Sequence, residues 1–235
     1  MVDETLEVRR RLAAGCRMFA MLGYEAGGTG HLTARDPRRS DHFWINPLGV
    51  PFARVTASSL VLVGPGADVS RANPSGVAIV SRLLEARPDV VGVAHAHTIH
   101  GVAVAALGSP IEPISQDACA FYEDHAVLDE YHGVVGEAES AAIADALGRA
   151  KALIMRRHGL LTVGASIGSA VWWLIALERA CRVQLLVAAA GGTHAIQPDV
   201  ARRAYEQVGV QEAADFSFEL MYDLVAGSRP ELLDR

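Results

Sequence analysis

The stretch VVGVAHAHTIHG (residues 90–101) places three histidines, His95, His97 and His100, at the end of an apolar run. Side chains alternate across a β-strand, so an extended run would point His95 and His97 to the same face of a sheet. Two imidazoles on one face can bind one metal ion. The pattern therefore raises the hypothesis of a metal site at the end of a buried strand.

The composition is that of an ordinary globular protein. The chain has 235 residues, of which 51% are hydrophobic and 20% are charged, so residues 1–235 can bury a sizeable core as a single domain. Two smaller domains are the alternative. The net charge of -6 and the lack of basic clusters argue against nucleic-acid binding. No window approaches the length of a membrane span. We expect small-molecule partners, with neither nucleic acid nor membrane.

The cysteines and the first residues point to the cytoplasm. Cys16, Cys119 and Cys181 are few, odd in number and widely spaced, which suits a reducing compartment better than a disulfide framework. The first 22 residues place acids before arginines and carry only a short apolar run, unlike a signal peptide. Lys151 is the single lysine and hence the single candidate for imine chemistry, which gives metal chemistry more weight.

Helical and strand patterns interleave along the chain. Asn73 is suited to cap a helix whose first residue is Pro74, where a missing N–H does no harm. Apolar spacing and glycine or proline breaks predict helices over 3–22, 74–86, 98–108, 137–149 and 166–192, and strands within 23–37, 43–49, 58–66, 90–96 and 151–159. This order predicts a layered α/β or α+β domain.

A third candidate ligand stands in ALIMRRHGLLTVG (residues 152–164). His158 is expected at the end of an apolar strand, where a rigid scaffold can hold a side chain toward a pocket. Three histidines with an open position define a catalytic rather than a structural metal site. A lone histidine more often has an ordinary surface or core role. The neighbouring Arg157 can hold a substrate carboxylate through two hydrogen bonds, or can equally form a surface ion pair.

Six blocks occur in the order typical of one family: GTGHLTARDP, INPLG, NPSG, RPDVVGVAHAHT, RRHGLLTVG and ALERACRVQLL. Along nearly its whole length the chain resembles the class II aldolase/adducin family. The resemblance implies a three-layer α/β/α sandwich around a mainly antiparallel sheet, assembled as a homotetramer with active sites between subunits. It also implies one divalent metal ion per subunit, bound by His95, His97 and His158. His100 is not a family ligand, and we expect it to be structural.

The departures from the family pattern bear on the reaction. The family's sugar-phosphate aldolases carry an acid–base glutamate in a P-S-S-E motif, and that position is Gly76 in NPSG. Glycine accepts no proton, so aldol chemistry loses its base. The smaller residue is also expected to leave room beside the metal. The phosphate loop T-S-G-N is altered, with a one-residue shift, and a phosphorylated sugar is therefore not expected. The residues expected to contact substrate are Thr29, His31, Asn46, Gly49, Ser75 and Arg157.

A polar segment, SQDACAFYEDHAVLDEYHG (residues 115–133), is a candidate source of catalytic groups. Charged side chains among apolar residues are usually paired, and perturbed pKa values gather at functional sites. We assign Asp117, Tyr122 and His125 to the site, whereas Glu123 and Asp124 can equally lie in a solvated loop. Tyr222 occupies the region where family members send a catalytic tyrosine into a neighbour's site, but its surroundings match the family poorly.

QDACAFYEDHAV (residues 116–127) resembles a branch of the family that lacks the glutamate and is related to non-haem iron oxygenases of aminocoumarin biosynthesis. This likeness implies Fe(II)- and dioxygen-dependent oxidative decarboxylation of a small 2-oxo or 2-hydroxy acid. A Zn or Mn lyase is the alternative, in which Asp117, Tyr122 or His125 replaces the glutamate. An adducin-like scaffold without activity is a second alternative, although retention of three histidines counts against it. Imidazole ligands do not select among these metals.

Overall fold

The structure is a computed structural model that describes residues 3–130, 133 and 136–228. Its strands are β1 (His31–Arg35), β2 (Phe43–Ile45), β3 (Val61–Val63), β4 (Gly92–Ala96), β5 (His125–Leu128), β6 (Ala152–Met155) and β7 (Gly159–Gly164). Its α-helices are α1 (Glu4–Met21), α2 (Pro74–Ala86), α3 (Ile99–Leu107), α4 (Gln116–Cys119), α5 (Glu137–Leu147), α6 (Ile167–Ala189), α7 (Pro198–Val208) and α8 (Gln211–Ser228). Two short 3₁₀ turns, Phe52–Arg54 and Ala57–Ser59, lie between β2 and β3.

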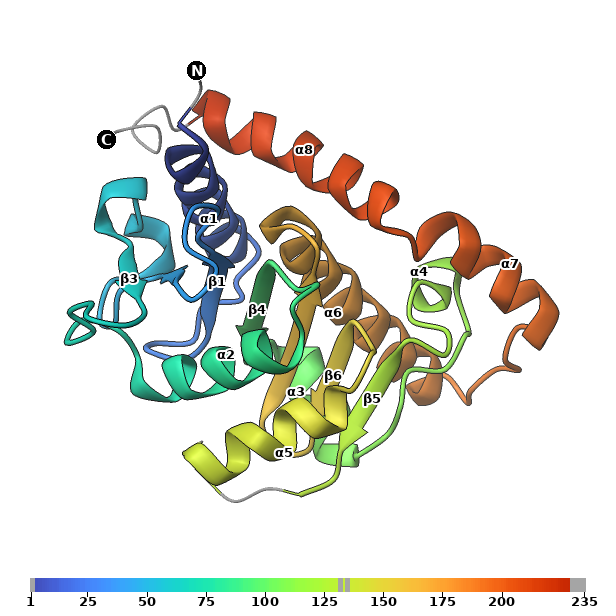
Figure 1. Ribbon diagram of the computed structural model, residues 1–235. Helices are drawn as coiled ribbons and strands as arrows, with labels where there is room; N and C mark the ends of the chain where they lie inside the picture. The colour runs from blue at the N-terminus through green and yellow to red at the C-terminus, as the bar shows by residue number, and fades with distance from the viewer. Residues whose placement is uncertain (1–2, 131–132, 134–135, 229–235) are drawn as a thin grey trace.

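The seven strands form one sheet in the order β3-β2-β1-β4-β7-β6-β5. The pairs are antiparallel except β5 with β6, which is parallel. Helices cover both faces, and Figure 1 shows α2 and α5 on one side of the sheet and α6 on the other. The expected fold class, an α/β/α sandwich with a mainly antiparallel sheet, is confirmed. The strand that carries the H-x-H motif, β4, lies at its centre.

Two apolar clusters, one on each face, explain which way the histidines point. Ala94 and Ala96 on β4 pack in the cluster that contains α1, α3 and α6. Val93 belongs to the opposite cluster, which contains α2 and α5. Because successive side chains of a strand alternate, His95 shares the face of Val93 and points toward α2. The sequence pattern of β4 therefore places the site between the sheet and α2.

Local contacts position α2 and α6 against the strands. The Asn73 side chain accepts a hydrogen bond from the Ser75 backbone N–H at 3.1 Å, and Pro74 begins α2, as the sequence predicts. On the other face, a Cβ added at Gly92 would lie 2.5 Å from the Ser166 carbonyl oxygen and 2.7 Å from the Ile167 Cα. Only glycine allows the start of α6 to approach β4 so closely.

The predicted strand at residues 151–159 is wrong at its end. β6 stops at Met155, and residues 156–158 form the turn into β7, so His158 lies in a turn rather than on a strand. Arg157 adopts φ 56°, a left-handed conformation that non-glycine residues rarely adopt. The sequence does not predict this chain reversal, because no glycine, proline or asparagine precedes it and the apolar run continues on both sides.

Lys151 ties the C-terminal helices to the sheet. Its ammonium group donates to the Gly209 carbonyl oxygen at 2.6 Å, lies 3.2 Å from the Asp124 carboxylate and stands 4.1 Å from the centre of the Trp173 ring. Burial lowers the pKa of this lysine. Tyr205 on α7 donates to the same carboxylate at 2.7 Å. Lys151, the one lysine of the chain, thus holds the end of α7 against the sheet. It does not line the cavity that His95, His97 and His158 share.

No helix in the described part of the chain is both long enough and apolar enough to cross a membrane. The helices that the sequence reading did not anticipate, α7 and α8, run along the outside of the molecule in Figure 1. Phe218 of α8 is fully buried in the cluster shared with α6, so these helices are packed parts of the fold.

A buried carboxylate on α6 caps the start of α3. Glu178 is 5% exposed and accepts hydrogen bonds from the Gly101 N–H at 2.7 Å and from the His100 N–H at 3.2 Å. The His100 ring donates through Nδ1 to the same carboxylate at 2.7 Å. The expectation that His100 is structural agrees with these contacts.

Glu178→Ala should lower the free energy of unfolding by about 2–3 kcal/mol, because it leaves two backbone N–H groups without their charged acceptor. Urea denaturation followed by circular dichroism measures the change. Glu178→Gln keeps one acceptor oxygen and should lose less. Equal stability of wild type and the alanine variant would show that this cap does not hold α3 to α6.

Candidate metal centre

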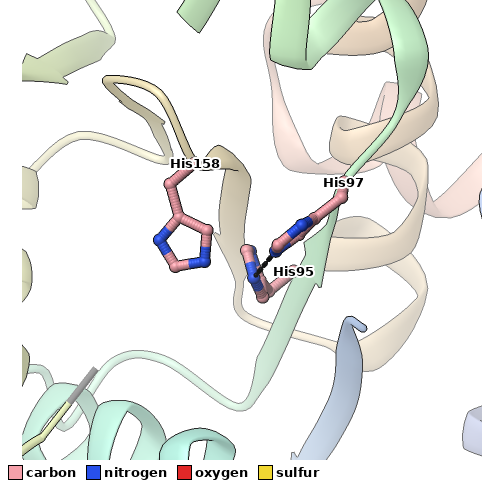
Figure 2. Close-up of side chains that lie close together, drawn as sticks. All are labelled: His95, His97 and His158. Carbon is pink, nitrogen blue, oxygen red and sulfur yellow. Dashed lines mark hydrogen bonds between the residues drawn. The ribbon is translucent and has the colours of Figure 1, made fainter. Parts of the chain in front are cut away.

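Three histidines converge where β4 ends and the β6–β7 turn crosses it. His95, His97 and His158 each offer one nitrogen, and these nitrogens all lie within 4.8 Å of one another. The ring centres are 4.8–5.0 Å apart. Figure 2 shows the three rings facing a common point; His95 lies on β4, His97 follows directly after this strand, and His158 lies in the turn. The structure brings together the three residues that the sequence reading proposed as ligands.

The geometry of this cluster fits one metal ion. The Nε2 atoms of His95 and His97 are 3.1 Å apart. With metal–nitrogen bonds of about 2.0–2.1 Å, that separation corresponds to an angle of roughly 95–100° at a shared ion. Nδ1 of His95 donates to the Leu160 carbonyl oxygen at 2.8 Å, which fixes the tautomer, so Nε2 of His95 carries a lone pair and is the acceptor in its hydrogen bond with His97 Nε2. A metal would therefore meet a prepared nitrogen rather than an N–H.

The rings are neutral at ordinary pH, as metal ligands must be. Burial is the main cause, and the neighbouring histidines add to it. Together they lower the pKa of His158 to about 4 and the pKa of His95 well below its usual value. Burial also lowers the pKa of His97. No proton has to be displaced before an ion binds near neutral pH.

The three histidines line a cavity of about 460 Å³. Thr29, His31, Ser75 and Arg157 also line it, as expected for substrate contacts. Among the described residues that form its wall there is no carboxylate, and Arg157 is the only lysine or arginine. The centre therefore offers neutral metal ligands and one cation, which suits an anionic organic ligand more than a cationic one.

A second cavity of about 450 Å³ adjoins the first and shares Thr29 with it. Asn46 and Gly49 line this second cavity and not the first. The Asn46 side-chain oxygen accepts the Leu32 N–H at 2.9 Å, so part of its capacity holds β1. The six expected substrate contacts are thus divided between two neighbouring cavities.

The His31 ring packs closely against Gly76 on one side. A Cβ at position 76 would lie 3.1 Å from both Cγ and Nδ1 of the His31 ring. His31 is 2% exposed, and its ring centre is 5.1 Å from that of His95. The two residues are direct partners in the β1–β4 register, so both rings face α2. Gly76 also lines the cavity of the three histidines, so the expectation that it leaves room beside the metal stays a prediction.

The residues assigned to catalysis lie elsewhere in the chain. Asp117 pairs with Arg179 at 3.2 Å, and the Tyr122 ring lies 5.9 Å from the Arg202 guanidinium. His125 sits on β5, at the far edge of the sheet. Its Nδ1 donates to the Phe121 carbonyl oxygen at 2.7 Å, and its Nε2 accepts the Ile111 N–H at 3.0 Å. None of the three lines the histidine cavity. Their catalytic role stays a prediction, because these side chains do not line the histidine cavity of their own chain.

Tyr222 is likewise outside the cavity. It lies on α8, stacks on Phe218 with ring centres 6.0 Å apart, and carries the Arg11 guanidinium 5.2 Å from its own ring centre. Burial raises its pKa.

Residues 131–132 of the polar segment lie outside the described residues. The sequence predicts His31 as a substrate contact but does not predict that it lies opposite His95. The β1–β4 pairing, which the alternation did not reveal, is the missing signal.

The fold and this histidine centre together define a class II aldolase-type domain. Residues 10–185 match the family described as "Class II Aldolase and Adducin N-terminal domain", and the chain belongs to this family. It is 37% identical over 229 residues to 4-hydroxy-3-prenylphenylpyruvate oxygenase/4-hydroxy-3-prenylbenzoate synthase of Streptomyces roseochromogenus subsp. oscitans, covering 94% of this chain and 83% of that protein. It is also 37% identical over 229 residues to Decarboxylase NovR of Streptomyces niveus, covering 94% and 85%.

A solved structure described as L-fuculose 1-phosphate aldolase from Glaciozyma antarctica PI12 is also similar. Its TM-score is 0.91 at 38% identity, over 99% of this chain and 93% of that one. The resemblance to the class II aldolase/adducin family and to its aminocoumarin branch is confirmed. Because these relatives are named as enzymes, the expectation that the chain is an enzyme is confirmed as well.

His97→Ala should remove most of the bound divalent metal, since two imidazoles remain where three converge. Elemental analysis of purified protein measures the metal per chain. His100→Ala is the matched control, because His100 binds Glu178 and does not belong to the three-histidine cluster; it should keep its metal. Stoichiometric metal in the His97 variant would remove this residue from the ligand set.

The metal-free protein should lose stability as the pH falls below about 6.5. Burial and the adjacent histidines lower the pKa of His31 to about 3, whereas an unfolded histidine titrates near 6.5. Between these values the unfolded chain binds more protons, so stability is complete above 6.5 and falls with pH by about 1.4 kcal/mol per unit for each such histidine.

Thermal denaturation in EDTA between pH 7.0 and 5.5 measures this slope, in a window above the titration of most carboxylates. His31→Phe should make the slope shallower, because one buried neutral imidazole is removed. A variant with the wild-type slope would show that His31 is not held neutral by burial.

Proposed function

We propose that this protein is an Fe(II)- and dioxygen-dependent enzyme that oxidatively decarboxylates a small 2-oxo or 2-hydroxy acid. The observation that carries the proposal is a three-histidine centre in a cavity whose described wall holds no carboxylate. The two relatives named as an oxygenase and a decarboxylase support it at 37% identity over 94% of the chain. Oxidative cleavage does not require the acid–base carboxylate that an aldol reaction uses.

The residues of the chain have separate tasks in this proposal. His95, His97 and His158 would hold the ion, which when bound supplies a Lewis acid and open positions for an organic acid and dioxygen. Arg157 lines the cavity beside them, and its guanidinium can bind the substrate carboxylate through two parallel hydrogen bonds. Ser75, in the first turn of α2, and Thr29 also line the cavity and carry hydroxyl groups. The acid is thereby oriented with its carboxylate end at the histidines.

A metal-dependent lyase with Zn or Mn is the second candidate function. The similarity to a structure described as an L-fuculose 1-phosphate aldolase favours it. Against it stands position 76, where the family's glutamate is absent and the His31 ring packs closely against the glycine. His31 is a poor substitute base, because burial holds its pKa at about 3. We therefore expect no useful turnover of fuculose, rhamnulose or ribulose phosphates.

Oxygen uptake by iron-loaded protein tests the proposal directly. With pyruvate, phenylpyruvate, 4-hydroxyphenylpyruvate and their 2-hydroxy counterparts, at least one acid should release carbon dioxide with stoichiometric loss of dioxygen. His97→Ala should abolish both signals, whereas His100→Ala should keep most of them. Turnover that continues at the same rate under strict anaerobiosis, or with zinc in place of iron, would decide for the lyase.

The assembly belongs to the proposal as well. We infer a homotetramer with active sites at subunit interfaces, which the family resemblance implies. Asp117, Tyr122, His125 and Tyr222 lie outside the cavity of their own chain, so a catalytic task for any of them requires a second subunit. Light scattering after size-exclusion chromatography should give four times the 25.0 kDa chain mass. A monomer with full activity would exclude all four residues from catalysis.

A further inference from the structure

The helix α3 is attached to two of the three converging histidines. It begins at Ile99, two residues after His97, so its first turn limits where His97 can lie. Further along the helix, the Ala105 carbonyl oxygen accepts the Arg157 N–H at 3.1 Å. Arg157 directly precedes His158, so this hydrogen bond ties the turn that carries His158 to the same helix. The position of α3 therefore bears on both histidines.

The same helix packs against the residue that fixes His95. The Leu160 carbonyl oxygen accepts the hydrogen bond from His95 Nδ1, and the Leu160 side chain lies against Gly101 of α3. A Cβ at Gly101 would be 2.5 Å from Cδ1 of Leu160 and 2.4 Å from Oγ1 of Thr98. A larger residue would displace the Leu160 side chain or the helix. α3 thus contacts the support of the third candidate ligand as well.

A buried carboxylate of α6 fixes the first turn of α3. Glu178 accepts hydrogen bonds from the His100 N–H at 3.2 Å and from the Gly101 N–H at 2.7 Å, one to each carboxylate oxygen. These donors lie three and four residues after His97. Hydrogen bonds to a buried charged acceptor are strong, and a negative charge is also favoured at a helix N-terminus. Two such bonds fix both the position and the direction of this end of α3.

We propose that Glu178 is a positioning residue of the metal centre, which holds α3 so that His95, His97 and His158 converge on one ion. It does not line the histidine cavity and acts through the backbone of α3. A site of this kind needs its ligands held to within about 0.5 Å, and a shift of α3 would change the distances between them. The inference rests on the proposed binding of a metal by the three histidines.

The competing explanation is that Glu178 only stabilises the fold. Its loss would then lower the free energy of unfolding without changing the metal affinity of the protein that stays folded. Phe218→Leu is the matched control, because it removes part of a fully buried ring and so lowers stability by a different route. Phe218 packs on Gly168, which lies ten residues before Glu178 on α6, or roughly 15 Å along the helix.

Cobalt binding reports the arrangement of the ligands without any turnover. Competition with a chelator gives the Kd for Co(II), and its visible absorption spectrum depends on the number and geometry of the ligands. Glu178→Ala should bind cobalt about 10–100-fold more weakly, as is typical when a group that supports a ligand is lost, and its spectrum should change. Glu178→Gln should recover part of the affinity, because its amide oxygen still accepts one N–H.

Two variants should bind cobalt as wild type does. His100→Ala keeps Glu178 and both of its backbone hydrogen bonds, and Phe218→Leu leaves the first turn of α3 unchanged. Circular dichroism of the metal-free variants identifies those that fold, and Glu178→Asp, whose carboxylate is one carbon shorter and should also weaken binding, serves if Glu178→Ala does not.

The outcomes separate this inference from the metal site on which it rests. Wild-type cobalt affinity and spectrum in a folded Glu178 variant with alanine or aspartate would overturn the inference alone. An equal loss of affinity in His100→Ala or in Phe218→Leu would also overturn it, because the effect would then not be specific to the two backbone hydrogen bonds. Failure of wild type to bind cobalt would overturn the proposed metal site as well.

Discussion

The hydrogen bond from His95 Nδ1 to the Leu160 carbonyl oxygen is the contact on which the centre depends. It crosses from β4 to the neighbouring β7, and at 2.8 Å it fixes both the tautomer and the direction of the His95 ring. The strand pairing that makes this bond also brings the β6–β7 turn, and with it His158, over the end of β4. The same central strand pairs with β1 on its other side and sets His31 opposite His95. The two pairings of β4, with β1 and with β7, therefore gather four imidazoles around one cavity.

Burial gives this group of histidines its chemical character. Removal from water and mutual repulsion keep the rings neutral, so their nitrogens can bind a cation. The same burial lowers the stability of the metal-free protein at low pH, because the folded protein resists protonation of these rings. The described cavity wall lacks a carboxylate, so an ion bound here would keep most of its positive charge. With Arg157 added, the cavity favours an anionic substrate. These features are the basis of the proposed oxidative decarboxylation.

Much of this arrangement could be predicted from the sequence, since period-two alternation in residues 90–97 and the N-cap at Asn73 reflect local backbone rules. The metal ligands needed the family resemblance, because spacing alone cannot place His158 beside His95. The turn at residues 156–158 escaped prediction because it contains no typical turn residue. The packing of His31 against Gly76 could not be predicted from the sequence, because it depends on strand pairing, which is non-local. A catalytic role for Asp117, Tyr122 and His125 stays a prediction. In one chain, Asp117 pairs with Arg179 and His125 contacts backbone groups, and such contacts cannot be derived from the polar pattern of the segment.

The ligands of the metal can be counted by X-ray absorption spectroscopy of iron-loaded protein, recorded anaerobically with and without phenylpyruvate. We expect three imidazole ligands in both samples, with the remaining oxygen ligands changing when the acid is added. His31→Phe should show the same three imidazoles, because His31 is not a ligand. A spectrum with fewer than three imidazoles, or one that the acid leaves unchanged, would contradict the claim that this three-histidine centre holds the metal and receives the substrate.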